Sequence, residues 1–421
     1  MERKLHKTET TTTFDNTKEY KLYRSIFKTA LSPMTAGSLK IKPRNGEELI
    51  LGSGEGGVNA TIELHNPIFF KKCVFYGDIG FGESYVDGDW DTDDLTKVVS
   101  WFISNVDKSP SMSGSERELS YVTFLQLLNK VGHWLKPNTI RGSKENIHKH
   151  YDISNKLFQL FLDSSMTYSS GYFDSPDREL EAAQTEKYDR LCRKLKLQPS
   201  DHILEIGSGW GGFAVHAIKN YGCRITTVTI SEEQFSYAKE RFVREGVADR
   251  VDIQLKDYRL ITGQYDKIVS IEMLEAVGHK FLKTFFAKCH EVLKKDGVMG
   301  LQVIICPDSR YDSFRKNVDW IQKYIFPGSL LPSVAAINSA INSTGDMFLH
   351  GLEEMGLHYA KTLATWRFNM NRNIQKVYEL GFDERFVRMW NYYFSYCEAA
   401  FKMRNINVVQ MVYSRPNNLK V

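Results

Sequence analysis

The chain has 421 residues, more than one core of ordinary size, which predicts two domains. Its 42% apolar and 25% charged residues are typical of a soluble globular protein, and a net charge of +4 is too weak for a nucleic-acid binder. The six cysteines are scattered without a C-x-x-C pair, which argues against a metal site or a disulfide framework and favours a reducing, cytoplasmic location.

The first part of the chain predicts a tail and a small domain. Residues 1–33 open with a polar, Thr-rich stretch that has no apolar signal-peptide segment, and we expect a disordered tail there. Residues 34–118 predict an α+β domain that ends in a linker from 105 onwards. Within it we expect strands at 39–42 and 60–66, Gly-rich turns from Gly77, and a helix whose start carries Asp91, Asp93 and Asp94.

Residues 119–421 predict an α/β domain. An amphipathic helix is expected over 119–136, and strands alternate with helices from about residue 200. Such repeated βα units predict a parallel, doubly wound sheet. The expected strands are 202–206, 224–230, 251–257, 267–273 and 298–305, and the expected helices are 213–221, 231–246 and 279–297. No stretch reaches 18 consecutive apolar residues, so we expect no transmembrane helix.

A glycine-rich motif, LEIGSGWGG, joins the first of these strands to a helix. Gly207, Gly209 and Gly211 allow a tight turn and a close approach of the backbone to a ligand. A plain strand-to-helix turn is the alternative interpretation. The motif differs from the dinucleotide fingerprint because the acidic Glu205 precedes the glycines, which suits a cationic cofactor better than a pyrophosphate.

The next two strands end in residues that fit a nucleoside. Thr229 and Gln234 follow the second strand and offer neutral hydrogen bonds to a ribose, where an NAD site would place an acidic residue. Asp257 and Tyr258 follow the third strand, where they can bond to and stack on an adenine.

The motifs LEIGSGWGG, VTISEEQ, KDYR and SIEMLEAVGH are similar to those of class I S-adenosylmethionine methyltransferases. With HYDISNKLFQLFLDSSMTYSSGYF, YIFPGSLLPS and HYAKTLATWRFNM, the chain resembles the cyclopropane-fatty-acyl-phospholipid synthases and the related mycolic acid cyclopropane synthases over residues 34–421. The resemblance implies a Rossmann-like doubly wound catalytic domain over 119–421 and a smaller lipid-associated α+β domain before it. It also implies transfer of a one-carbon unit from S-adenosylmethionine to acyl double bonds of membrane phospholipids, which forms a cyclopropane fatty acid.

The resemblance also implies which residues bind the cofactor. The residues at the matching motif positions are Tyr168, Ser169, Gly207, Gly209, Thr229, Gln234, Asp257, Tyr258 and Ile271. For Tyr168 a capped tyrosine in the core is the alternative interpretation.

The implied chemistry needs a dry pocket and a base. An alkene attacks the sulfonium methyl only when it is held close and in line, and the carbocation that forms would be quenched by water. Aromatic faces can stabilise such a cation, although core packing is the simpler interpretation for most of the aromatic residues. Members of the family use bicarbonate as the proton acceptor, and the resemblance assigns its pocket to Glu275, Tyr359 and the backbone amide of Ile304.

The chain departs from the family pattern at two positions of that pocket. Ser170 stands where some bacterial members have Cys, and Gln302 stands where they have His. Both side chains still form hydrogen bonds, but neither can carry the charge of a histidine. Slower loss of the proton would favour a methyl-branched or methylene product, so the sequence leaves the product open.

Two further alternatives come from other kinds of protein. The first is a methyltransferase acting on a small amine, since alkaloid N-methyltransferases share some of these motifs; their glutamate is usually followed by His, where this chain has Ala276. The second is a lipid carrier with an inactive catalytic domain, against which the complete glycine motif argues. The oligomeric state, including a homodimer, is left open.

A basic segment, 130–151, predicts peripheral membrane association. It holds five Lys or Arg residues and Trp134 against one acid, Glu145, which suits anionic lipid headgroups. A solvated linker face is the alternative.

We therefore expect binding to anionic vesicles that weakens as salt rises, because charges are screened over about 8 Å at physiological ionic strength. Reversing the charge with Arg141→Glu and Lys144→Glu should weaken co-sedimentation with these vesicles further. Equal binding to neutral and anionic vesicles at every salt concentration would contradict the prediction.

Overall fold

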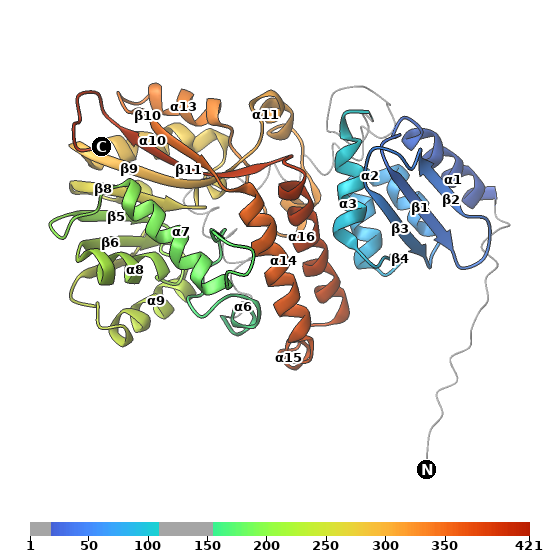
Figure 1. Ribbon diagram of the computed structural model, residues 1–421, viewed down its shortest axis with the longest axis horizontal. Coiled ribbons are helices and arrows are strands. Elements are labelled where there is room, and N and C mark those ends of the chain that lie inside the picture. The colour runs from blue at the N-terminus through green and yellow to red at the C-terminus, as the bar shows by residue number, and fades with distance from the viewer. Residues whose placement is uncertain (1–17, 109–154) are drawn as a thin grey trace, which may run out of the picture. The chain divides into compact units, whose positions relative to one another are not determined.

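The computed structural model describes residues 18–108 and 155–421 (Figure 1). The chain divides into two compact units, 1–125 and 126–421. The predicted helix 119–136, the basic segment 130–151, residues 1–17 and residues 109–118 of the expected linker lie outside the described residues.

Within residues 18–108, the first unit is a four-stranded sheet with three α-helices. Its strand order is β2-β1-β3-β4, and the strands expected at 39–42 and 60–66 are confirmed as β1 and β3. The elements are α1 (Lys18–Leu31), β1 (Ser38–Pro43), β2 (Leu49–Gly52), β3 (Asn59–Leu64), α2 (Ile68–Val86), β4 (Trp90–Asp91) and α3 (Leu95–Ser104), followed by a short 3₁₀ helix at Val106–Lys108.

Two expectations for this unit are wrong, and one is confirmed. The expected tail is helical from 18 to 31, because Phe27 packs edge-on against the rings of Phe69 and Phe70 at centroid distances of 5.5 and 5.3 Å. The Gly-rich turns expected from Gly77 are instead part of α2, which kinks at that glycine. The helix start is confirmed at Asp94, whose side chain accepts the amide of Lys97 and caps α3, whereas Asp91 lies on β4.

The second unit contains a seven-stranded sheet of order β10-β11-β9-β8-β5-β6-β7. Its strands are β5 (His202–Ile206), β6 (Arg224–Thr229), β7 (Val251–Leu255), β8 (Tyr265–Ile271), β9 (Leu293–Ile305), β10 (Phe348–Glu354) and β11 (Asn407–Ser414). The parallel arrangement expected for the strands between 202 and 305 is confirmed, but β11 runs antiparallel to both of its neighbours. The α/β, doubly wound fold class is therefore correct, and the sheet is mixed.

Helices cover both faces of this sheet (Figure 1). Residues of α7 (Leu180–Lys194), α8 (Gly212–Tyr221) and α9 (Glu232–Arg244) form one buried cluster with the sheet. Residues of α10 (Leu282–Val292) and α13 (Val334–Asn342) form a second cluster on the other face. The helix expected over 279–297 ends at Val292, because the chain enters β9 at Leu293.

The remaining helices lie beyond the carboxyl ends of the strands or link the later elements. They are α6 (Asn155–Phe161), α11 (Asp308–Phe314), α12 (Trp320–Tyr324), α14 (Gly356–Arg372), α15 (Ile374–Glu379) and α16 (Glu384–Lys402). Parallel strands bring their carboxyl ends to one edge, where ligands of such sheets bind. None of the helices within 18–108 and 155–421 is both long and apolar enough to cross a bilayer.

Candidate active site

A cavity of about 350 Å³ opens at the carboxyl ends of the parallel strands. All nine residues predicted to bind the cofactor line it, and so do Glu275, Tyr359 and Ile304 of the predicted proton-acceptor pocket. Ser170 and Gln302 are fully buried and do not line the cavity. The structure thus brings twelve of the fourteen predicted site residues to one cavity.

The glycine motif shapes the end of this cavity after β5. Gly209 has a φ of +49°, and a Cβ atom built there meets no atom within 4 Å, so a side chain would enter the cavity. Gly211 serves packing instead, because its Cβ would lie 2.7 Å from the Phe242 ring. The motif therefore combines a ligand-facing glycine with one that lets α9 approach the turn.

The polar residues on this side fit a nucleoside with a cationic group. Thr229 donates its hydroxyl to Gln234 at 3.0 Å, which fixes both side chains after β6. Asp257 is already engaged by Arg259, which reaches it through Nε at 2.8 Å and Nη2 at 2.6 Å. Glu205 has a buried Oε2 with no hydrogen-bond partner among the described residues, and burial raises its pKa to about 8. A cation in the cavity would satisfy this oxygen.

Tyr168 and Ser169 lie on the cofactor side of the cavity, and each forms a hydrogen bond with a residue from a helix. The hydroxyls of Tyr168 and Tyr393 lie 3.0 Å apart, and Ser169 Oγ accepts a 2.6 Å hydrogen bond from Lys187. Lys187 is fully buried, and desolvation lowers its pKa to about 7. The sequence analysis did not identify this lysine, since it stands at an ordinary position of the amphipathic helix α7.

Glu272, which immediately follows β8, was not among the predicted site residues. Its backbone has a φ of +49° and donates to the Gln302 carbonyl at 2.7 Å. A non-glycine residue in this region costs on the order of 1–3 kcal/mol, so the surrounding contacts hold it there. Its Oε1 accepts from the Ser170 amide at 2.9 Å and from Gln302 Nε2 at 2.8 Å, and Tyr359 is a further hydrogen-bond partner. The motif SIEMLEAVGH contained this signal, as an acid directly after a central strand.

Burial governs the charge of Glu272. Desolvation raises its pKa, and the charge of Lys187 together with the hydrogen bonds that the carboxylate accepts opposes this rise. The same carboxylate raises the pKa of the buried Tyr359 hydroxyl well above its ordinary value, with burial as the larger cause. Tyr359 therefore stays protonated and acts as a donor.

Glu275 follows Glu272 in the chain and lies in the short 3₁₀ helix Leu274–Ala276. Its Oε1 accepts the Ile304 amide at 2.5 Å, while Oε2 is buried without a partner among the described residues. Burial and then the charge of Glu272 raise its pKa to about 8, so the carboxyl holds a proton at neutral pH. The resemblance assigned Glu275 and Ile304 to a bicarbonate ion, and in the structure the two bind each other.

Gln302 and Ser170 lie behind the residues that line the cavity and contact Glu272 from there. Gln302 accepts a 3.0 Å hydrogen bond from Gln410 and directs its amide nitrogen at Glu272, while Ser170 directs its hydroxyl at the Gly171 carbonyl. Both residues therefore position the Glu272 carboxylate rather than face a ligand.

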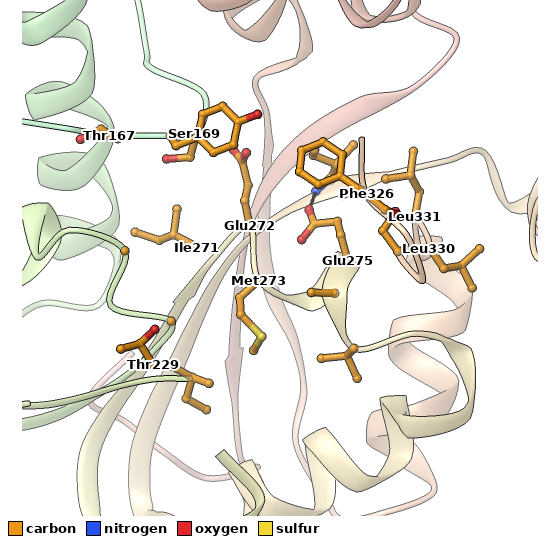
Figure 2. A pocket seen from close by; sticks show the side chains of 18 of the residues that line it. Thr167, Ser169, Thr229, Ile271, Glu272, Met273, Glu275, Phe326, Leu330 and Leu331 are labelled. Carbon is orange, nitrogen blue, oxygen red and sulfur yellow. Dashed lines mark hydrogen bonds between the residues drawn. The ribbon is translucent and has the colours of Figure 1, made fainter. Parts of the chain in front are cut away.

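The far side of the cavity is apolar. Figure 2 shows Thr229 and Ile271 on one side of Glu272, and Phe326, Leu330 and Leu331 beyond Glu275. Among the aromatic side chains near the predicted motifs, Phe326, Tyr393 and Tyr396 line the cavity. Trp320, Trp366 and Tyr392 do not line it and are buried in the core.

Comparisons with known proteins agree on the family. The model of the mycolic acid cyclopropane synthetase family matches residues 139–411. The tuberculostearic acid methyltransferase of Mycobacterium tuberculosis is 38% identical over 84% of this chain and 83% of its own length. The cyclopropane-fatty-acyl-phospholipid synthase of Escherichia coli is 37% identical over 90% of this chain and 95% of its own length. A solved mycolic acid cyclopropane synthase complexed with SAH and CTAB superposes with a TM-score of 0.60, at 28% identity, over 65% of this chain and 98% of its own.

The open space at Gly209 predicts a specific loss of binding. Gly209→Val should abolish binding of S-adenosylhomocysteine in calorimetry, because the branched side chain would fill the space that the ligand needs. Gly246→Val is the matched control, since Gly246 also has a positive φ and an open Cβ position but does not line the cavity. Equal binding by both variants would show that the ligand does not bind at the glycine motif.

Proposed function

Because the chain belongs to the mycolic acid cyclopropane synthetase family, we propose that it transfers a one-carbon unit from S-adenosylmethionine to an acyl double bond of a membrane phospholipid. The observation that carries this proposal is the division of the cavity, with polar nucleoside-type contacts at one end and an apolar chamber at the other. A lipid acyl chain needs the second part, whereas a small polar substrate does not.

The cofactor supplies an electrophilic methyl group when it is bound. On the cofactor side, Gly207 and Gly209 give backbone access, and Thr229 and Gln234 suit the ribose. Glu205 offers a buried carboxyl oxygen that has no hydrogen-bond partner among the described residues. Tyr168 and Ser169 line the same cavity.

The apolar side holds the acyl chain and excludes water. Phe326, Leu330, Leu331 and Leu363 present hydrocarbon surface, and Tyr393 and Tyr396 present aromatic rings. A cation on the acyl chain is stabilised by an aromatic face by about 1–2 kcal/mol when both are desolvated. These apolar walls also disfavour binding of a polar substrate or water, which would lose its hydration there without gaining hydrogen bonds.

A cyclopropane is the main product that we propose, in line with the E. coli relative. A methyl-branched product is the second candidate, because the name of the mycobacterial relative specifies methyl transfer to a fatty acid. The replacement of His by Gln at position 302 is the feature of this chain that bears on the choice. The likeness to a coclaurine N-methyltransferase, at 19% identity, extends to the fold alone.

Three further parts of the proposal concern the membrane, the first unit and the oligomeric state. We propose that the protein works at the membrane surface and that the basic segment 130–151 contributes to its binding. The domain at 34–118 is proposed to associate with lipid, as the resemblance implies. A homodimer also remains a proposal, to be tested by the mass of the protein in solution.

Expression in a bacterium that lacks its own synthase provides the direct test. A cyclopropane adds CH₂ to each modified double bond, whereas a saturated methyl branch adds CH₄ and needs an external hydride donor. A methylene chain also adds CH₂, but it keeps a double bond that mild hydrogenation reduces. Mass spectrometry of the fatty acid methyl esters before and after hydrogenation separates these products. Unmodified fatty acids from a well-expressed, cofactor-binding protein would contradict the proposed function.

The two neighbouring carboxyl groups predict the pH dependence of turnover. Glu275 has a pKa raised to about 8, so it is neutral below that pH and becomes a second negative charge beside Glu272 above it. Turnover should fall as pH rises through about 8. Glu275→Gln keeps the site neutral, so it should flatten this fall in initial rates measured from pH 6 to 9.5. An unchanged alkaline limb in the variant would assign the fall to another group.

A further inference from the structure

The reaction needs a proton acceptor, and the residues that line the cavity limit which group can serve as that acceptor. Ring closure releases a proton from the transferred methyl inside a chamber with apolar walls, so a group of the site must take it. Five acidic residues line the cavity among the described parts of the chain: Glu205, Asp257, Glu272, Glu275 and Asp319.

Two of these carboxylates are committed to structural partners. Asp257 forms a two-pronged ion pair with Arg259. Asp319 caps α12, because its Oδ1 accepts the Gln322 amide at 2.8 Å. Taking up a proton would cost each of them these bonds.

Two others already hold a proton near neutral pH. Glu205 lies at the end of β5 beside the glycine motif, and Glu275 lies against the Ile304 amide. Burial raises the pKa of each to about 8. A carboxyl group that is already protonated cannot accept another proton in this role.

Glu272 differs because the groups around it stabilise a negative charge on its carboxylate, which faces the cavity. The Ser170 amide, the Gln302 amide nitrogen and the Tyr359 hydroxyl all donate to it. These donors belong to the pocket in which the resemblance places bicarbonate. They are directed at a carboxylate of the chain itself, and the Ile304 amide is directed at Glu275.

We propose that Glu272 is the proton acceptor of the reaction and replaces an exogenous bicarbonate ion. This inference rests on the proposed function and adds a catalytic residue to it. Strained backbone at Glu272 and the second layer formed by Gln302 and Gln410 hold the carboxylate in place.

The alkene π pair forms a C–C bond to the donor's methyl carbon as the C–S bond breaks, which leaves S-adenosylhomocysteine and a carbocation at the other alkene carbon. A C–H bond of the new methyl group then breaks, its electron pair closes the three-membered ring, and the proton passes to Glu272. The neutral acid returns that proton to solvent before the next turnover.

Two variants of Glu272 and the omission of bicarbonate test the proposal. Wild-type enzyme should form product at the same rate in carbonate-depleted, CO₂-free buffer with or without added bicarbonate. Glu272→Gln should bind S-adenosylhomocysteine as the wild type does but lose turnover by roughly 100- to 10,000-fold, the range for an acid-base group. Glu272→Gly suits the positive φ and frees the donors, so added bicarbonate or formate should restore its turnover by about tenfold or more.

Binding provides a readout that does not depend on activity. In calorimetry with the S-adenosylhomocysteine complex, bicarbonate should bind to Glu272→Gly and not to the wild type. Glu398→Gln is the matched control, because Glu398 is a buried carboxylate paired with Arg367 away from the cavity, and its turnover should not depend on bicarbonate.

The outcomes separate this inference from the proposed function. A wild-type enzyme that modifies acyl chains only when bicarbonate is added, or a fully active Glu272→Gln variant, would overturn the role of Glu272 and leave the proposed function standing. A wild-type enzyme that modifies no acyl chains under any condition would overturn the proposed function itself. If Glu272→Gly fails to fold, the wild-type bicarbonate dependence and Glu272→Gln still decide the question.

Discussion

The mutual repulsion of two neighbouring carboxyl groups governs this site. Glu272 and Glu275 line one cavity and both lose solvation there, so both cannot be charged near neutral pH without a large cost. The hydrogen-bond donors of the pocket are shared unequally between these two carboxyl groups, so only one of them is charged. Glu272 receives donors from several elements, whereas Glu275 receives one backbone amide and keeps its proton.

The fold supplies those donors from distant parts of the sequence. Gln302 lies on β9 and Gln410 on β11, and the antiparallel register sets these two residues directly opposite each other. Gln410 also donates to the Lys187 carbonyl, so α7 is tied to the same layer. The pairing of β11 with β9 therefore fixes the position of an active-site carboxylate from behind, as second-layer contacts do in preorganised sites.

The cavity also explains how one chain can serve a charged cofactor and an apolar substrate. The strand ends and the glycine turn expose backbone and polar groups on one side, while α14, α16 and the segment around Phe326 supply hydrocarbon and aromatic surface on the other. Because the carboxyl side chains stand at the boundary between these surfaces (Figure 2), acid-base chemistry is confined to the region where the two ligands meet.

The sequence by itself determined the fold class, the glycine turn and twelve of the residues that line the cavity, because these depend on local periodicity and on motifs adjacent to strand ends. It did not reveal the helix at 18–31, whose order comes from aromatic packing against α2, or the antiparallel β11, whose direction depends on a return of the chain from α16. Only the tertiary structure decided that Ser170 and Gln302 lie behind the wall and that Glu272 faces the cavity. Those assignments depend on groups from distant parts of the sequence converging on one carboxylate, which no local pattern encodes.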